Sequence, residues 1–162
     1  MKALVTGGGG FLGGAIVHFL RQRGDEVRSF ARGAYPALEE AGVEVHRGNL
    51  ADAAAVSRAV QGMDVVVHLA ADPSGGQWES VLRNNIVGAY NMFEACCQAG
   101  VGRLVAASTI QVSTGHRQQE PYCAVQEGRP QQLPPDAPRI GADVPAEPRN
   151  IYGSSKVFNE SL

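Results

Sequence analysis

The chain has 162 residues, of which 44% are hydrophobic and 19% are charged, and its formal net charge is -2. This length and composition predict one globular domain with a single core and exclude a disordered chain. The near-neutral charge argues against a nucleic-acid partner, and no apolar run approaches the ~18 residues of a membrane-spanning helix.

Apolar runs and helical spacings alternate along the first two thirds of the chain. Residues 2–6 are a short apolar run closed by glycines, typical of a strand buried on both faces, and residues 11–24 show helical apolar spacing that ends at Gly24. We expect further strands at 26–31, 43–48, 64–71 and 102–108, and further helices at 36–42, 51–62 and 77–99. Strands joined by crossover helices predict a doubly wound parallel α/β sheet with strand order 3-2-1-4-5.

Residues 114–150 differ from the rest in composition, because they hold most of the nine prolines and show little periodicity. A Pro/Gly-rich loop of this length inside a domain is usually either functional or disordered. Both alternatives stay open, and residues 1–162 are predicted to form one nucleotide-binding domain that contains this loop.

The segment TGGGGFLG (6–13) lies between the first predicted strand and its helix. Glycines there let the backbone turn tightly and let a pyrophosphate approach the main chain, while the start of the helix offers unpaired amides. Two spacings fit, Gly8-Gly10-Gly13 and Gly7-Gly10-Gly13. The predicted phosphate-binding residues are Thr6, Gly7, Gly10, Phe11, Leu12 and Gly13.

The end of the second strand bears on the choice of cofactor. An acid at this place would bind the adenosine ribose and repel a 2′-phosphate, but here Ala31 and Arg32 stand there. A guanidinium pairs with phosphate, so the sequence favours NADP, with NAD as the alternative. Further cofactor contacts are expected from Asn49 and Leu50 after the third strand and from Leu69, Ala70 and Ala71 after the fourth.

Tyr152 and Lys156 lie four residues apart, so on a helix they share one face. A phenol is a weak base at neutral pH, and a neighbouring ammonium stabilises its phenolate. Thr109 follows the fifth strand at the carboxyl edge, where ligands bind in such sheets; we expect it to hold a substrate oxygen and Ser108 to lie closer to the cofactor.

The cysteines Cys96, Cys97 and Cys123 lack the paired spacing of metal sites,. We therefore expect no metal and a cytoplasmic location. The start of the chain reads as a strand and not as a signal peptide.

The ordered motifs TGGGGFLG, HLAA (68–71), NNIVG (84–88), ASTIQV (107–112) and YGSSK (152–156) resemble those of the extended short-chain dehydrogenase/reductase family, the NAD-dependent epimerase/dehydratase group. The resemblance implies a Rossmann-like domain in which Tyr152 is the acid/base, Lys156 assists it and binds the nicotinamide ribose, and Thr109 orients the substrate. It also implies that Asn85 helps to organise the site. The segments around Thr109 and Tyr152 are most similar to uronate dehydrogenases and sugar epimerases.

Two departures from the family pattern matter. Dehydratases of the family carry an acidic pair after the threonine, whereas Ile110 and Gln111 stand here, so elimination of water is not expected. Family members also continue beyond the helix of Tyr152, so the resemblance implies the first part of a longer enzyme, without the C-terminal strands and substrate-binding portion. An exposed sheet edge should result.

The expected function is NAD(P)-dependent oxidation, reduction or epimerisation of a sugar or sugar nucleotide. The partner is a small, sugar-like molecule. The resemblance also implies a homodimer through the helix around Asn85–Phe93 and the helix that begins near Tyr152. The alternative is a nucleotide-binding module or inactive fragment that performs no chemistry.

Overall fold

The computed structural model describes residues 1–162 and contains a five-stranded sheet in the order β3-β2-β1-β4-β5, with every pairing parallel. The predicted strand order is therefore confirmed. The strands are β1 (Lys2–Thr6), β2 (Glu26–Ala31), β3 (Glu44–Arg47), β4 (Val65–His68) and β5 (Arg103–Ala106). β5 is an edge strand, and its Val105 is 50% exposed, so the sheet face at this strand is partly uncovered.

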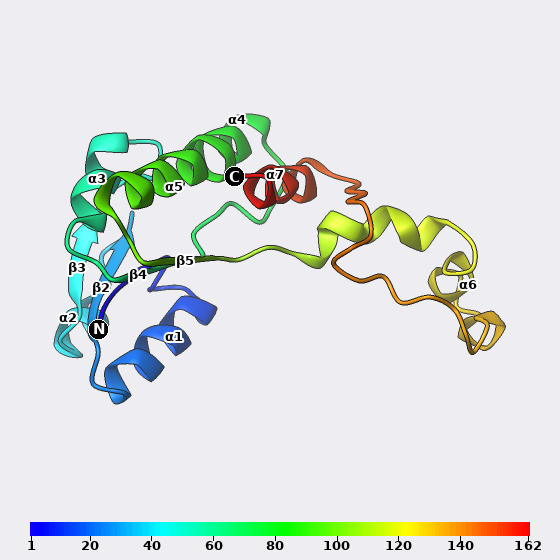
Figure 1. Cartoon of the computed structure of the whole chain (residues 1–162), viewed down its shortest axis with the longest axis horizontal. Coiled ribbons are helices and arrows are strands. Elements are labelled where there is room, and N and C mark those ends of the chain that lie inside the picture. Colours follow the sequence, from blue (N-terminus) through cyan, green and yellow to red (C-terminus); the bar gives the residue numbers. More distant parts are fainter.

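Helices cover the two faces of the sheet unequally (Figure 1). One face carries α1 (Phe11–Gln22) and the short α2 (Pro36–Glu40), and the other carries α3 (Ala53–Val60), α5 (Gly88–Ala99) and α7 (Ile151–Glu160). Nothing among these helices combines the length and the apolar character needed to cross a membrane.

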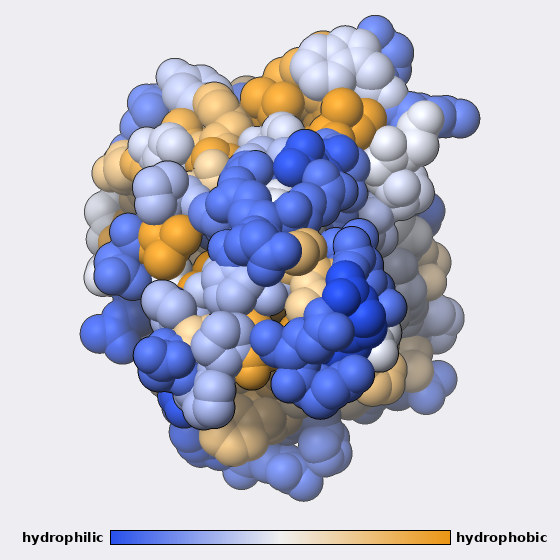
Figure 2. All heavy atoms as spheres, turned by 90° about the vertical axis from the view of Figure 1, so that its right-hand side faces the viewer, coloured by the Kyte–Doolittle hydropathy of each residue, from blue (hydrophilic) through white to orange (hydrophobic).

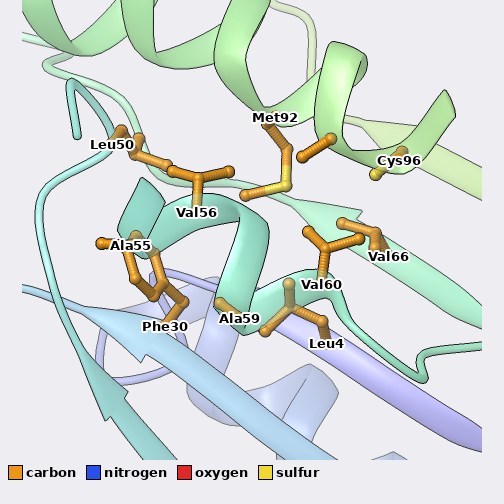
Figure 3. Close-up of a cluster of buried hydrophobic side chains, with 11 residues drawn as sticks. Leu4, Phe30, Leu50, Ala55, Val56, Ala59, Val60, Val66, Met92 and Cys96 are labelled. Carbon is orange, nitrogen blue, oxygen red and sulfur yellow. The ribbon is translucent and has the colours of Figure 1, made fainter. Parts of the chain in front are cut away.

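The core is divided by the sheet into two clusters. Figure 3 shows the larger one, in which strand residues such as Leu4, Phe30 and Val66 face Val60 of α3 and Met92 of α5. Each such side chain contributes about 1.5–3 kcal/mol on burial. The smaller cluster joins β1 and β2 to Val17 and Leu20 of α1.

The helix predicted over residues 77–99 is interrupted. It consists of α4 (Trp78–Val81), a π-helical turn η1 (Leu82–Val87) and α5. A π turn inserts one extra residue into the helical repeat and often marks a functional site. Here it contains Asn85, which is buried; an average period of 3.6 residues does not reveal such a local change.

Residues 110–150 form an excursion away from the sheet (Figure 1). They contain three short helical turns, η2 (Ile110–Gln118), α6 (Cys123–Gln126) and η3 (Pro130–Gln132). The loop predicted at 114–150 therefore has local helical structure. Two backbone hydrogen bonds of 2.7 Å, from Gly115 to Glu147 and from Glu147 to Val112, fasten the outgoing and returning halves together. Such long-range pairing leaves no periodic signal in the sequence.

Thr6 and His68 stand opposite each other on β1 and β4. The Thr6 hydroxyl accepts the amides of Leu69 and Ala70, each at 3.0 Å, so it donates its own proton to Nδ1 of His68 at 2.9 Å. Burial, with a smaller effect of the Lys156 charge, lowers the pKa of His68 to about 4. His68 is thus a neutral residue that is packed in the core.

Gly13 sets the distance between α1 and the loop after β1. A Cβ at Gly13 would overlap the carbonyl oxygen of Gly7, whereas a Cβ at Gly14 would meet the Gly8 carbonyl oxygen at 3.7 Å, an ordinary contact. The two neighbouring glycines therefore have different steric requirements.

We predict that Gly13→Ala lowers the free energy of unfolding by about 1–3 kcal/mol, the usual cost of overpacking. Gly14→Ala, the matched control, should instead stabilise by up to about 1 kcal/mol through helix propensity. Urea denaturation followed by circular dichroism measures both, and equal effects of the two substitutions would contradict the steric argument.

His68 should also give folding stability a pH dependence. Its pKa is about 4 in the folded state against 6.5 for an unperturbed histidine, so the unfolded state binds more protons between these values. Stability is then full above pH 6.5 and falls, by on the order of 3 kcal/mol in total, as the pH drops toward 4. His68→Gln should flatten this part of the curve of unfolding free energy against pH.

The exposed His18 of α1 provides the control. The curve of His18→Gln should run parallel to that of the unaltered protein. If the curve of His68→Gln also ran parallel, the buried neutral imidazole would not be the cause.

Candidate active site

A cleft of about 410 Å³ opens at the carboxyl ends of β1, β2 and β4. This is the edge at which ligands bind in doubly wound sheets. Eight of the residues predicted to contact the cofactor line it: Gly7, Gly10, Ala31, Arg32, Leu50, Leu69, Ala70 and Ala71.

The glycine loop presents main-chain groups to this cleft. Gly7 has a φ of 71° and its carbonyl accepts the Gly10 amide at 2.9 Å, a turn that favours glycine. The first hydrogen bond of α1 runs from Gly14 to Gly10, so the amides of Phe11, Leu12 and Gly13 have no intrahelical acceptor. The side chains of Phe11 and Leu12 are exposed, which leaves their amides as the groups suited to a pyrophosphate.

The other eight predicted cofactor residues do not line the cleft: Thr6, Phe11, Leu12, Gly13, Asn49, Ser108, Tyr152 and Lys156. Three of them have side chains that are engaged elsewhere. Thr6 is fully buried in the pair with His68, and the Asn49 carboxamide accepts the Ala51 amide at 3.0 Å. The Ser108 hydroxyl donates to Glu160 of α7. Thr6 still shapes the cleft, since it fixes the amides of Leu69 and Ala70.

Five further residues line the cleft that sequence reasoning did not name: Phe30, Gly33, Tyr35, Gly48 and Asn84. Tyr35 is the most informative, because its ring packs so closely on Gly9 that a Cβ there would overlap it. This contact joins two loops that are far apart in sequence. The signal in the sequence was weak, an aromatic residue before Pro36 in a turn-like segment.

Lys156 and Tyr152 lie together on α7, as their spacing predicted. Lys156 is 2% exposed, and its Nζ donates to the Ala107 carbonyl at 2.7 Å. The same Nζ lies 5.9 Å from the centroid of the Tyr152 ring. Burial lowers the pKa of Lys156, and an ammonium in such surroundings strongly favours a negative charge beside it.

Asn85 connects α7 to the loop after β4. Its Nδ2 donates to the Asp72 carbonyl at 3.0 Å and to the Ser155 hydroxyl at 3.1 Å, while its Oδ1 accepts the Asp72 amide at 2.6 Å. With its side-chain amide turned so that the nitrogen faces Asn85, Asn159 donates to the Asn85 main-chain carbonyl at 2.9 Å. Asn85 therefore positions other groups, and its side chain has little capacity left for a ligand.

Thr109 begins η2 at the end of β5, where its hydroxyl accepts the Gln111 amide at 3.3 Å. The first turn of α7 packs directly on this segment. Asn150 caps α7 by accepting the Gly153 amide at 2.7 Å and donates to the Gln111 side chain at 2.6 Å. The fold thus brings the segments of Thr109 and Tyr152 to the same sheet edge.

Comparisons with known proteins agree with this arrangement. The chain is 46% identical over 122 residues to a 2-alkyl-3-oxoalkanoate reductase of Stenotrophomonas maltophilia, which covers 75% of this chain and 36% of the reductase. It is 36% identical over 162 residues to an L-arabinose 1-dehydrogenase (NAD(P)(+)) of Haloferax volcanii, which covers 99% of this chain and 59% of the dehydrogenase. The chain thus spans less than two thirds of each relative.

Solved structures give the same result. A uronate dehydrogenase from Agrobacterium tumefaciens complexed with NAD superposes with a TM-score of 0.77 at 32% identity, over 99% of this chain and 54% of that one. A UDP-glucose 4-epimerase from Thermus thermophilus complexed with NAD has a TM-score of 0.77 at 31% identity, over 99% and 49%. The model of the NAD dependent epimerase/dehydratase family matches residues 3–162. The chain therefore belongs to the NAD-dependent epimerase/dehydratase family.

Proposed function

We propose that this chain is the cofactor-binding and catalytic part of an NAD(P)-dependent oxidoreductase that acts on a hydroxyl or carbonyl group of a sugar-like substrate. The observation that carries this proposal is the buried Lys156 ammonium beside the Tyr152 ring. A buried ammonium whose hydrogen-bond partner is a neutral carbonyl is costly, and such groups gather at functional sites.

The cleft fits a dinucleotide. Gly7, Gly10 and the unpaired amides of Phe11–Gly13 would hold the pyrophosphate, and the hydrophobic wall of Leu50, Leu69 and Ala70 suits the rest of the cofactor. When bound, the nicotinamide would supply the hydride acceptor or donor.

The protein's own residues would handle the proton. The Tyr152 phenolate takes the proton from a substrate hydroxyl during oxidation and returns it to the carbonyl oxygen during reduction. Lys156 stabilises that phenolate, and the Thr109 hydroxyl donates a hydrogen bond to the substrate oxygen. Asn85 holds α7 in the position that these contacts require, through its hydrogen bond to Ser155.

The residues after Thr109 limit the reaction type. Ile110 has no acidic group and is exposed, and the Gln111 carboxamide is engaged by Asn150 at 2.6 Å. Neither residue can protonate a leaving hydroxyl. This favours oxidation, reduction, or epimerisation by oxidation and re-reduction over elimination of water.

The relatives narrow the substrate class. Two of them are named as a uronate dehydrogenase and an L-arabinose 1-dehydrogenase, and another as a 2-alkyl-3-oxoalkanoate reductase. Uronates and oxoalkanoates both carry a carboxylate. We propose a sugar or a sugar acid as the substrate.

Arg32 and Tyr35 support a preference for NADP. Arg32 is exposed, lines the cleft and makes no ion pair, although its charge contributes to lowering the pKa of Asp72 after hydrogen bonds from Ser74 and Ser80. Tyr35 also lines the cleft, and its hydroxyl has no hydrogen-bond partner within the protein. A 2′-phosphate between a guanidinium and a phenol would satisfy both donors.

Fluorescence titration with NADPH and NADH should give tighter binding of NADPH. Arg32→Ala should weaken NADPH binding by about tenfold or more, the loss of one charge-assisted hydrogen bond, with little effect on NADH. Arg58→Ala, at an exposed position of α3, should leave both affinities unchanged. Tighter binding of NADH would overturn the NADP preference but not the oxidoreductase.

Tyr152→Phe should reduce NAD(P)-coupled turnover about 10²- to 10⁴-fold, the usual contribution of a general acid/base. Cofactor affinity should stay within a few-fold. Tyr90→Phe, an exposed tyrosine of α5, should leave turnover unchanged.

The competing function is a nucleotide-binding module without chemistry. It would hold the dinucleotide in the same cleft. Tight NAD(P)H binding with no turnover over a panel of sugars and sugar acids would support this competing function. Unchanged turnover in Tyr152→Phe would instead reject the catalytic role of Tyr152.

A further inference from the structure

A second recess lies in the excursion, outside the cofactor cleft. It has a volume of about 750 Å³. Its walls come from η2, from the segment Tyr122–Gln126 that includes α6, and from Ile140 and Arg149 on the returning half. None of its lining residues belongs to the cofactor cleft.

The recess is lined by positive charge that no acid in its walls neutralises. Arg117 and Arg149 contribute guanidinium groups, and the other polar lining residues, Thr114, Gln118 and Gln126, are neutral. Arg117 is exposed and makes no ion pair, while Arg149 makes an ion pair of 3.5 Å with a Glu147 carboxylate oxygen. Two guanidinium groups facing one cavity favour an anion.

Glu147, the acid that pairs with Arg149, is also engaged by the scaffold of the excursion. The Glu147 carboxylate receives the Gln119 amide at 2.7 Å and lies 3.3 Å from Nδ1 of His116. The other nitrogen of that imidazole lies 2.8 Å from the Pro145 carbonyl. These contacts hold Glu147 against η2, and with the backbone bonds between the two halves they make the recess a built feature of the excursion.

The remaining lining residues offer apolar contacts to the carbon skeleton of a small organic molecule. Tyr122, Val125 and Ile140 line the recess, and the Tyr122 hydroxyl is occupied because it donates to the Pro138 carbonyl. Figure 2 views the molecule from the side of the excursion and shows a largely hydrophilic face with small apolar patches between the polar groups. The lining therefore combines anion recognition with modest apolar contact.

The recess shares its walls with the segments that carry the proposed catalytic groups. The Thr114 hydroxyl donates to the Gln111 carbonyl at 3.2 Å, and the Gln111 side chain is held by Asn150, the cap of α7. Arg149 precedes that cap directly in the chain. Thus η2 connects the recess to Thr109, and α7 connects it to Tyr152.

We propose that this recess binds the carboxylate or phosphoryl group of a small organic anion, held between Arg117 and Arg149, and that the enzyme selects its substrate by this group. The binding step stands on the recess alone. The selection step rests on the proposed function and deepens it, because it makes the substrate a sugar acid or sugar phosphate and not a neutral sugar.

Isothermal titration of the chain without cofactor tests the binding step. Galacturonate and glucose 6-phosphate are the carboxylate and phosphoryl probes, and galactose is the neutral control. At least one anion should bind and galactose should not. Arg117→Gln and Arg149→Gln should each weaken that binding by about tenfold or more.

Arg139→Gln is the matched control, because Arg139 is an exposed arginine of the same excursion that does not line the recess. It should leave the affinity unchanged, and all variants should keep the circular dichroism spectrum and NADPH affinity of the unaltered chain. If one recess variant fails to fold, the other still tests the site. The site is overturned if neither anion binds at tens of millimolar, if galactose binds equally, or if Arg139→Gln weakens binding as much.

The selection step has its own readout. The selection step is supported if the enzyme turns over the bound anion in preference to galactose. Arg117→Gln should then abolish this preference by raising KM for the anion, while kcat is retained. Anion binding without any turnover would leave the recess as a binding site and remove its link to the substrate.

Discussion

The hydrogen bond from the buried Lys156 ammonium to the Ala107 carbonyl joins α7 to the end of β5. A charge taken out of water needs such a partner, because an unpaired buried ammonium would lose its proton or destabilise the fold. The same Nζ lies 5.9 Å from the centroid of the Tyr152 ring, so the tyrosine lies beside this contact. The cofactor cleft lies at the carboxyl edge of the same sheet, so this one contact relates the proposed proton-transferring group to the proposed cofactor.

Several buried polar side chains hold that arrangement in place and do not contact a ligand themselves. Thr6 bonds to His68 and to two backbone amides of the cleft, and Asn85 ties the loop after β4 to Ser155 of α7. Each is buried with its hydrogen bonds satisfied, which makes it rigid. The cleft, in contrast, is lined by glycine main chain and small apolar side chains, which leave room for a cofactor. Rigid support and open lining are therefore provided by different residues.

The excursion of residues 110–150 is also held by internal hydrogen bonds, although it lies away from the sheet. Its halves are fastened by backbone bonds around Gly115 and Glu147, and its end returns to the cap of α7 at Asn150. A long segment held in this way can present fixed charges, such as Arg117 and Arg149, next to the elements that carry Thr109 and Tyr152. Specificity in this family member would then come from a loop attached to a common scaffold.

The sequence by itself determined the order of the elements, the parallel sheet and the glycine loop, because apolar periodicity and turn residues are local signals. It also placed Tyr152 and Lys156 on one helical face, since a spacing of four residues is sufficient for that. Only the tertiary structure decided that Tyr35 packs on Gly9, that Asn85 lies in a π turn, and that Ser108 bonds to Glu160 and not toward the cleft. Those contacts join residues distant in the chain, and a long-range contact in an irregular segment leaves no period to detect.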